Sequence, residues 1–508
     1  MNLLSSASIF SFYTLISRLL GYLRDILIAF FLGTSIYADA FFVAFRIPNT
    51  FRRLFAEGTF NAAFIPSYAD EKLKNSKKGK KFADEIFNLL LIFLIIFILI
   101  VEIFTPLLVY LIAPGFFEDS QKFNLAVEFT RITFPFLLFV TLSSLLSGIL
   151  NTNNKFAAAA AAPIVLNVIL IGCLLFSFYF NQSYAKNLSI GVTLSGLLQF
   201  IILLFFTKKF YFPNIKFIFK IKKNLKKFFR KLLPSIFSSG ITQINILIGT
   251  IIASFQSGAV SYLYYADRIY QINLAIAGIA VSTVVLPNLS KSIKSNNINL
   301  TNIIQNKSIE LSLLFSLPAT FGLFLASEQI INCLFGYGTF SENDIALTSS
   351  ALTFFAIGVP AFALIKVLSN FYFARDNTKL PFYISVLVMI INIIISVVFF
   401  KKYGFIIIPI ATSISTWIGV LIYYILLQKN KILELENKTL INFLKISFAT
   451  ILMCLTLHFN LYYFEDKFQY AVKFKLIYLL IVIVSSATIY LLSANILGVL
   501  RIKNYKLK

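Results

Sequence analysis

Long, uninterrupted apolar runs dominate this chain of 508 residues and restrict the folds open to it. Two of them, NLLLIFLIIFILIV at 88–101 and YISVLVMIINIIISVVFF at 383–400, contain no charged residue. The interior of a bilayer offers no water to the backbone, so a chain inside it must form helices or a closed barrel. Because these runs are continuous rather than alternating, they predict transmembrane helices.

About fourteen segments approach the ~20 residues that a helix needs to cross a bilayer. The composition agrees, because 58% of the residues are hydrophobic and only 13% are charged, well below the share typical of soluble domains. The expected fold class is therefore an all-α integral membrane protein. We expect its spans at 4–32, 37–67, 86–113, 125–150, 156–180, 187–207, 232–255, 258–289, 308–335, 345–374, 380–400, 404–427, 441–463 and 474–499.

The distribution of basic residues predicts the orientation in the membrane. Most of the 45 lysines and arginines fall in loops on the side of the N-terminus, including KLKNSKKGKK (72–81), the segment 208–231 and the tail RIKNYKLK. Positive loops face the cytoplasm, so both termini are expected there. The mixed aromatic and lysine pattern of 208–231 could bind nucleic acid, but the spans on both sides favour an amphipathic cytoplasmic linker on anionic lipid, with no nucleic acid partner.

The two halves of the chain resemble each other. Pro135 precedes Asn167 by 32 residues, and Pro360 precedes Asn392 by the same distance. Six spans per half is an even number, which predicts a parallel repeat about an axis along the membrane normal. We expect a six-helix N-lobe (1–207), the linker (208–231), a six-helix C-lobe (232–428), and two extra helices with a basic tail (429–508).

Charged residues inside the first two spans are the main candidates for a functional site, because burying a charge within a bilayer is costly. Three interpretations compete: snorkelling, structural ion pairs such as Arg53 with Glu57 at i,i+4, and an aqueous cavity that binds an anion. The positive excess favours the anion, and arginine binds phosphate bidentately. The basic residues are Arg18, Arg24, Arg46, Arg52 and Arg53, and the acidic ones are Asp25, Asp39 and Glu57.

No soluble type of catalytic site is apparent in the sequence. A G-x-x-x-x-G-K-[ST] phosphate loop is missing, which argues against a built-in ATPase. His458 is the single histidine, and Cys173, Cys333 and Cys454 have neither metal nor redox spacing. We expect no enzyme activity and no cofactor.

Four stretches carry a resemblance to a known family. They are SRLLGYLRD (17–25), ADAFFVAFRIPNTFRRLFAEGTFNAAFIP (38–66), YYADRIY (264–270) and ARDNTKLP (374–381). The chain resembles the MurJ/MviN family of lipid II flippases along its whole length. The resemblance implies the fold of the multidrug/oligosaccharidyl-lipid/polysaccharide exporter superfamily, with two lobes around a cationic cavity and a groove at the last two helices for an undecaprenyl tail.

The resemblance also implies a function and a set of residues. The family moves lipid II from the cytoplasmic to the periplasmic leaflet of the bacterial inner membrane by alternating access, with the diphosphate head group in the cavity. By motif position, substrate-binding residues would be Arg18, Arg24, Arg52 and Arg268. Cavity or gating residues would be Ser17, Asp25, Asp39, Arg46, Arg53 and Glu57.

Two departures from the family pattern concern ion coupling. Gln271 follows YADRIY where some relatives have an acid, and the seventh span lacks the carboxylate that some members use to bind sodium. Asp376 and Asn392 remain as weak sodium candidates, and the coupling ion stays open. Expected partners are lipid II, membrane lipids and cell-wall synthesis or division proteins. The alternatives are a drug/cation antiporter of the same superfamily, a flippase for another polyprenyl-diphosphate-linked saccharide, and a non-transport scaffold.

Overall fold

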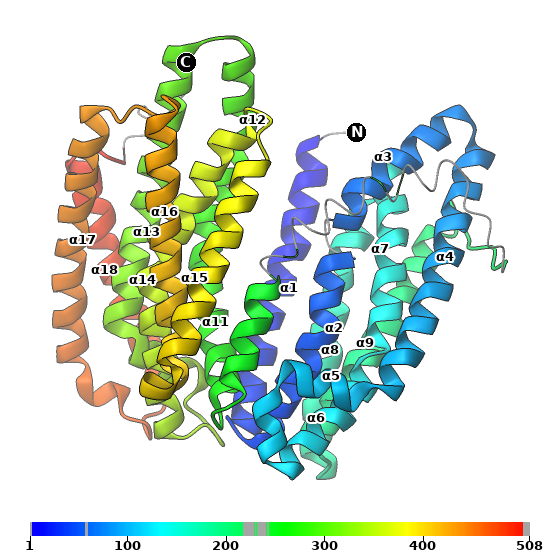
Figure 1. Ribbon diagram of the computed structural model, residues 1–508. Coiled ribbons are helices and arrows are strands. Elements are labelled where there is room, and N and C mark those ends of the chain that lie inside the picture. Colours follow the sequence, from blue (N-terminus) through cyan, green and yellow to red (C-terminus); the bar gives the residue numbers. More distant parts are fainter. Residues whose placement is uncertain are drawn as a thin grey trace. The chain divides into compact units, whose positions relative to one another are not determined.

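The computed structural model describes residues 3–55, 59–216, 228, 230, 240 and 243–500, and all its regular elements in these ranges are helical (Figure 1). The chain divides into two compact units, Met1–Ser261 and Tyr262–Lys508. Most of the segment 208–231 and all of the tail 501–508 lie outside the described residues, so the expected amphipathic linker helix stays a prediction.

The first unit is built from helices that run up and down along one direction (Figure 1). In chain order they are α1 (Leu3–Leu32), α2 (Ile36–Phe55), α3 (Thr59–Lys74), α4 (Ser76–Ile103), α5 (Thr105–Ile112), the short η1 (Pro114–Glu118), α6 (Ser120–Thr133), α7 (Phe136–Thr152), α8 (Phe156–Phe180), α9 (Tyr184–Thr207) and the helix Gln243–Ala253.

The second unit begins inside a helix and contains a π-helical turn, a form that is often found at functional sites. Its elements are α11 (Ala259–Leu274), the π-helical η2 (Ala275–Ala280), α12 (Val281–Lys294), α13 (Ile298–Phe335), α14 (Glu342–Phe373), α15 (Lys379–Tyr403), η3 (Gly404–Ile406), α16 (Ile407–Lys429), α17 (Asn437–Tyr463), η4 (Glu465–Phe468) and α18 (Lys475–Ile496).

Ten stretches of the described chain are long and apolar enough to cross a membrane, and one of them, Lys379–Lys429, contains both α15 and α16. Three further expected spans are not among these ten. They are α1 and the α2–α3 pair, which carry the arginines, and the seventh span, of which the helix Gln243–Ala253 is described. Together these segments account for the expected fourteen spans.

Several expected spans are divided in the structure. The span expected at 37–67 consists of α2 and α3, and the basic segment 72–81 is largely helical rather than a loop, because Asn75 caps α4 through Lys77 N. The span at 125–150 breaks at Pro135, which has no N–H to continue the helical hydrogen bonds. The equivalent Pro360 lies within an unbroken α14.

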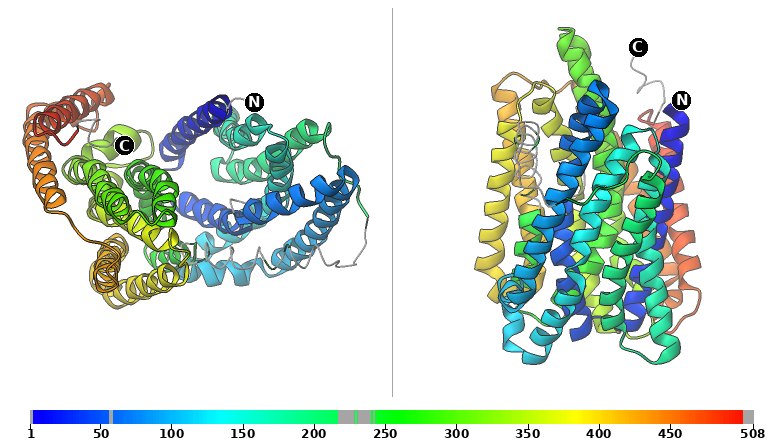
Figure 2. Two further views of the ribbon diagram at one scale, coloured as in Figure 1. Left: turned by 90° about the horizontal axis from the view of Figure 1, so that it is seen from above. Right: turned by 90° about the vertical axis from the view of Figure 1, so that its right-hand side faces the viewer.

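The same pairs of helices pack in both units, as the internal repeat predicts. In the first unit α3 packs on α4 and α7, α7 on α9, and α9 on α8. In the second unit α12 packs on α13 and α14, α14 on α16, and α16 on α15. The final pair, α17 and α18, lies outside the repeat and packs side by side with each other and against α13 (Figures 1 and 2).

Large apolar side chains are exposed on the outer faces of many helices, including Phe178 on α8, Val398 on α15, Leu455 on α17 and Val484 on α18. Water would penalise such a surface, whereas lipid tails are as apolar as these side chains. The interior is more varied, since buried serine, threonine and asparagine accompany the apolar core. Both features fit a helix bundle that spans a bilayer.

Candidate functional site

Arg24 is the centre of a buried polar network between α1 and α8. Its Nε and Nη2 donate to Asp25 Oδ1 at 3.0 and 2.7 Å, and its Nη1 donates to Asn167 Oδ1 at 2.9 Å. Asn167 Nδ2 in turn donates to the Ser17 carbonyl at 2.8 Å. Arg24 and Asp25 are only 6% and 3% exposed. The guanidinium is therefore held in place, and its charge is balanced by the adjacent carboxylate.

The two arginines of α1 lie deep within the span. At 1.5 Å per residue, Arg24 lies about 12 Å and Arg18 about 21 Å from the C-terminal end of the helix. Arg18 is exposed, whereas Arg24 is buried. A charged group at this depth needs either a partner or water. Arg24 has its partner, whereas Arg18 is exposed on the surface of α1.

The contact between Arg24 and Asn167 predicts a measurable contribution to stability. Asn167→Leu removes a hydrogen bond to a charged group and should lower the free energy of unfolding by about 1.5–3 kcal/mol. Asn392→Leu is the matched control in the second repeat, because Asn392 contacts the neutral hydroxyls of Thr412 and Ser396 and should lose ~1 kcal/mol or less. Denaturant unfolding of the purified variants measures both, and equal losses would contradict the prediction.

Asp39 lies in the first turn of α2, just after the connection from α1, and its carboxylate is fully buried. Lys122 Nζ donates to Oδ2 at 2.6 Å, and the Gly258 amide donates to the same oxygen at 2.9 Å. The Ser261 amide and hydroxyl both donate to Oδ1, at 2.9 and 2.5 Å. Asp39 thus ties the start of α2 to the starts of α6 and α11.

The partner of Asp39 lies far from it in the sequence. Lys122 precedes the expected fourth span, yet it is 4% exposed and its ammonium lies 4.2 Å from the centre of the Phe116 ring. Asp119 caps α6 through the amides of Gln121 and Lys122 and so fixes the backbone that carries this lysine. The signal in the sequence for an ordered Lys122 is Asp119, a helix-capping residue three positions earlier.

The arginines of α2 follow one another towards the end of that helix. Arg46 Nη1 donates to the Thr250 hydroxyl, and Arg52 Nε donates to Asn49 Oδ1 at 2.9 Å. Arg53 is half-buried at the end of the helix. Glu57 lies outside the described residues, so its expected pairing with Arg53 stays a prediction.

The charge balance of the first two spans can now be assessed from the described contacts. Asp25 is paired with Arg24, and Asp39 with Lys122, which is not one of the arginines. By count, the five arginines of these two spans exceed their three acids, Asp25, Asp39 and Glu57. A site of this kind can bind an anionic group, and the guanidinium geometry suits phosphate.

Arg268 belongs to the second unit and lies on α11 one turn after Tyr264. Its Nη2 donates to the Tyr264 hydroxyl at 2.8 Å, and the guanidinium lies 4.6 Å from the centre of the same ring. Asp267 accepts a hydrogen bond from Gln271 one turn later. Gln271 thus supplies a neutral donor to a carboxylate.

The two weak sodium candidates are not brought together. Asp376 is exposed in the turn after α14, with a left-handed φ of 57°, whereas Asn392 is buried within α15. Asn392 lies 13 residues beyond the start of α15, or roughly 20 Å along the helix. Among the described residues no group of three or more His, Cys, Asp or Glu side chains could hold a metal ion.

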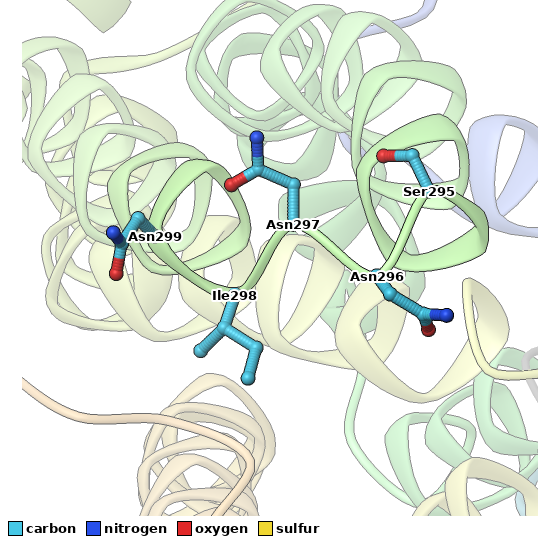
Figure 3. A pocket seen from close by; sticks show the side chains of 5 residues that line it. All are labelled: Ser295, Asn296, Asn297, Ile298 and Asn299. Carbon is cyan, nitrogen blue, oxygen red and sulfur yellow. The ribbon is translucent and has the colours of Figure 1, made fainter.

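A shallow hollow of about 500 Å³ lies at the turn between α12 and α13, lined by Ser295, Asn296, Asn297, Ile298 and Asn299 (Figure 3). Its polar groups have local roles. Asn297 Oδ1 accepts from the Leu300 amide to cap α13, and Asn296 adopts a left-handed φ of 54°. The hollow is therefore a helix-capping turn rather than a binding site.

These features define the class of the protein as a multi-pass helical membrane protein with two related halves. A solved structure described as an inward-facing multidrug resistance MATE family transporter of the MOP superfamily shares this fold, with a TM-score of 0.70 and 14% identity over 82% of this chain and 94% of that one. The fold alone follows from that likeness.

The chain belongs to the family described as "Lipid II flippase MurJ", whose sequence model matches residues 28–481. A probable lipid II flippase MurJ of Rickettsia prowazekii is 39% identical over 90% of this chain and 89% of the relative. One from Buchnera aphidicola subsp. Baizongia pistaciae is 34% identical over 100% and 99%. A solved lipid II flippase MurJ in an inward closed conformation has a TM-score of 0.81 and 30% identity over 96% of this chain and 98% of that one.

Proposed function

We propose that this chain is a flippase that carries lipid II from the cytoplasmic to the periplasmic leaflet of the bacterial inner membrane, with both of its termini in the cytoplasm. The observation that carries the proposal is the excess of arginine over acidic residues in the first two spans, one of whose acids, Asp39, forms an ion pair with Lys122. Lipid II offers the complementary chemistry, a diphosphate on a lipid.

In this proposal the diphosphate docks on Arg18, Arg24, Arg52 and Arg268. Asp25 and Asn167 fix the position of the Arg24 guanidinium. Arg18 is exposed at mid-span, and Arg52 is oriented through Asn49. The isoprenoid tail stays in lipid or along α17 and α18, whose faces expose Leu455 and Val484. The N-lobe (1–207) and the C-lobe (232–428) move relative to each other during transport. The contacts of Asp39 with Lys122, Gly258 and Ser261 keep the starts of α2, α6 and α11 together, at the end of the first unit opposite to the N-terminus.

The function is tested by the location of lipid II in cells that lack the protein. On depletion, lipid II should accumulate where an externally added head-group-cleaving agent cannot reach it, and an Arg52→Gln variant should fail to restore access. Lys438→Gln, which changes an exposed lysine near the start of α17, is the surface control and should restore access fully. Normal cleavage in depleted cells would refute the proposal.

Three alternatives predict other outcomes. A drug/cation antiporter of the same fold would favour a cavity rich in carboxylates, which the arginine excess opposes, and its loss would change drug tolerance without trapping lipid II. A flippase for another polyprenyl-diphosphate-linked saccharide would trap that lipid instead. A scaffold that gathers cell-wall synthesis or division proteins would leave lipid II accessible from outside.

A further inference from the structure

Asn88 on α4 makes three hydrogen bonds with its side-chain amide. Nδ2 donates to the Asp84 carbonyl one turn earlier and to the Asn214 carbonyl, both at 2.8 Å. Oδ1 accepts from the Lys216 amide at 3.1 Å. The side chain therefore binds the backbone of residues 214–216, which follow α9, through the Asn214 carbonyl and the Lys216 amide.

Asn306 on α13 repeats this arrangement in the second unit. Its Nδ2 donates to the Asn302 carbonyl one turn earlier at 3.0 Å and to the Glu434 carbonyl at 2.8 Å. Its Oδ1 accepts from the Glu436 amide at 3.1 Å. The same three bonds thus hold the backbone of residues 434–436, which follow α16.

The two asparagines occupy equivalent places in the repeat. α4 and α13 are the third spans of their halves, and α9 and α16 are the sixth. Each of the two bound segments also has a buried side chain just before the residues that the asparagine contacts. This side chain is Tyr211 in segment 208–216 and Leu433 in segment 430–436, and each is 1% exposed. Burial raises the pKa of the Tyr211 hydroxyl far above its ordinary value, and the nearby Asp84 carboxylate raises it further. The Tyr211 side chain is therefore neutral.

The chemistry explains why asparagine occupies both positions. A side-chain amide offers one acceptor and two donors, so it can pair with a carbonyl and an amide of an extended chain as a neighbouring strand would. A carboxylate could accept from the amide, but it would face two carbonyl oxygens without a proton to donate. A leucine of similar size would leave the backbone groups unpaired.

We propose that Asn88 and Asn306 are a symmetry-related pair of clamps, each of which fixes the segment that leaves its six-helix repeat to the third helix of that repeat. A motion of either repeat would then carry its outgoing segment along, as far as Lys216 in the first and Glu436 in the second. The second clamp also positions α17, where the Thr439 hydroxyl donates to Glu310 on α13 at 3.0 Å. The proposal holds whatever molecule the protein carries.

Residue-resolved amide hydrogen exchange on the full-length protein tests the clamps. In the unmodified chain the Lys216 and Glu436 amides should exchange more slowly than those of their neighbours Ile215 and Leu435. Asn88→Ala should speed exchange at Lys216 roughly five- to tenfold and leave Glu436 unchanged, and Asn306→Ala should do the reverse.

Asn299→Ala is the control, because Asn299 is exposed in the first turn of α13, and it should change neither amide. If a clamp variant does not fold, the comparison of Lys216 with Ile215 and of Glu436 with Leu435 in the unmodified chain still tests the proposal. Equal exchange at Lys216 and Ile215, or an effect of either substitution on both segments alike, would overturn the proposal.

Discussion

Arg24→Gln is expected to abolish the rescue of a flippase-depleted bacterium. The change removes the guanidinium that donates to Asp25 and Asn167, and with it the positive charge that balances a carboxylate only 3% exposed. Breaking a buried ion pair from one side costs about 3–5 kcal/mol. Growth on depletion of the native flippase measures rescue, and the amount of protein in the membrane measures folding.

A double variant separates a structural role of Arg24 from a role in binding. Arg24→Gln with Asp25→Asn replaces both charges by neutral amides, so the amount of protein in the membrane should recover. If Arg24 also binds the diphosphate, growth should still fail. Restored growth in the double variant would show that Arg24 serves only to balance Asp25.

Much of the fold could be predicted from the sequence because the bilayer imposes length and polarity on each span. The expected 4–32 corresponds to α1, Leu3–Leu32, and the equal spacing of Pro135–Asn167 and Pro360–Asn392 marks helices that pack alike in both units. The breaks were harder to place. The helix breaks at Phe134–Pro135 but continues through Pro360, so a proline in the sequence does not by itself place the end of a helix.

The site was only partly predictable, for a different reason. The arginine excess can be counted in the sequence, but the partner of each charge depends on contacts between distant segments. Asp39 and Lys122 are 83 residues apart, and Arg24 and Asn167 are 143 apart. No local spacing rule reports such pairs, whereas the bond between Asp267 and Gln271 lies at the i,i+4 spacing that a helix brings together.

Asp39→Asn is expected to release the starts of α6 and α11 from α2. The carboxylate accepts from Lys122, Gly258 and Ser261 with both oxygens, and an asparagine amide in its place would present NH₂ to one set of these donors. It would also leave the ammonium of Lys122, which is 4% exposed, without its counter-charge. The free energy of unfolding should fall by about 3–5 kcal/mol, as measured by denaturant unfolding of the purified protein.

Companion variants test whether the charge pair or the backbone contacts dominate this loss. Lys122→Met with Asp39→Asn removes both charges and should recover a large part of the stability, because a neutral pair carries no desolvation penalty. Ser261→Ala removes one hydroxyl donor and keeps the ion pair, so it should lower stability by only ~1–3 kcal/mol. If the double variant were as unstable as Asp39→Asn alone, the amide donors of Gly258 and Ser261 would be the main contributors to the stability of this end of the unit.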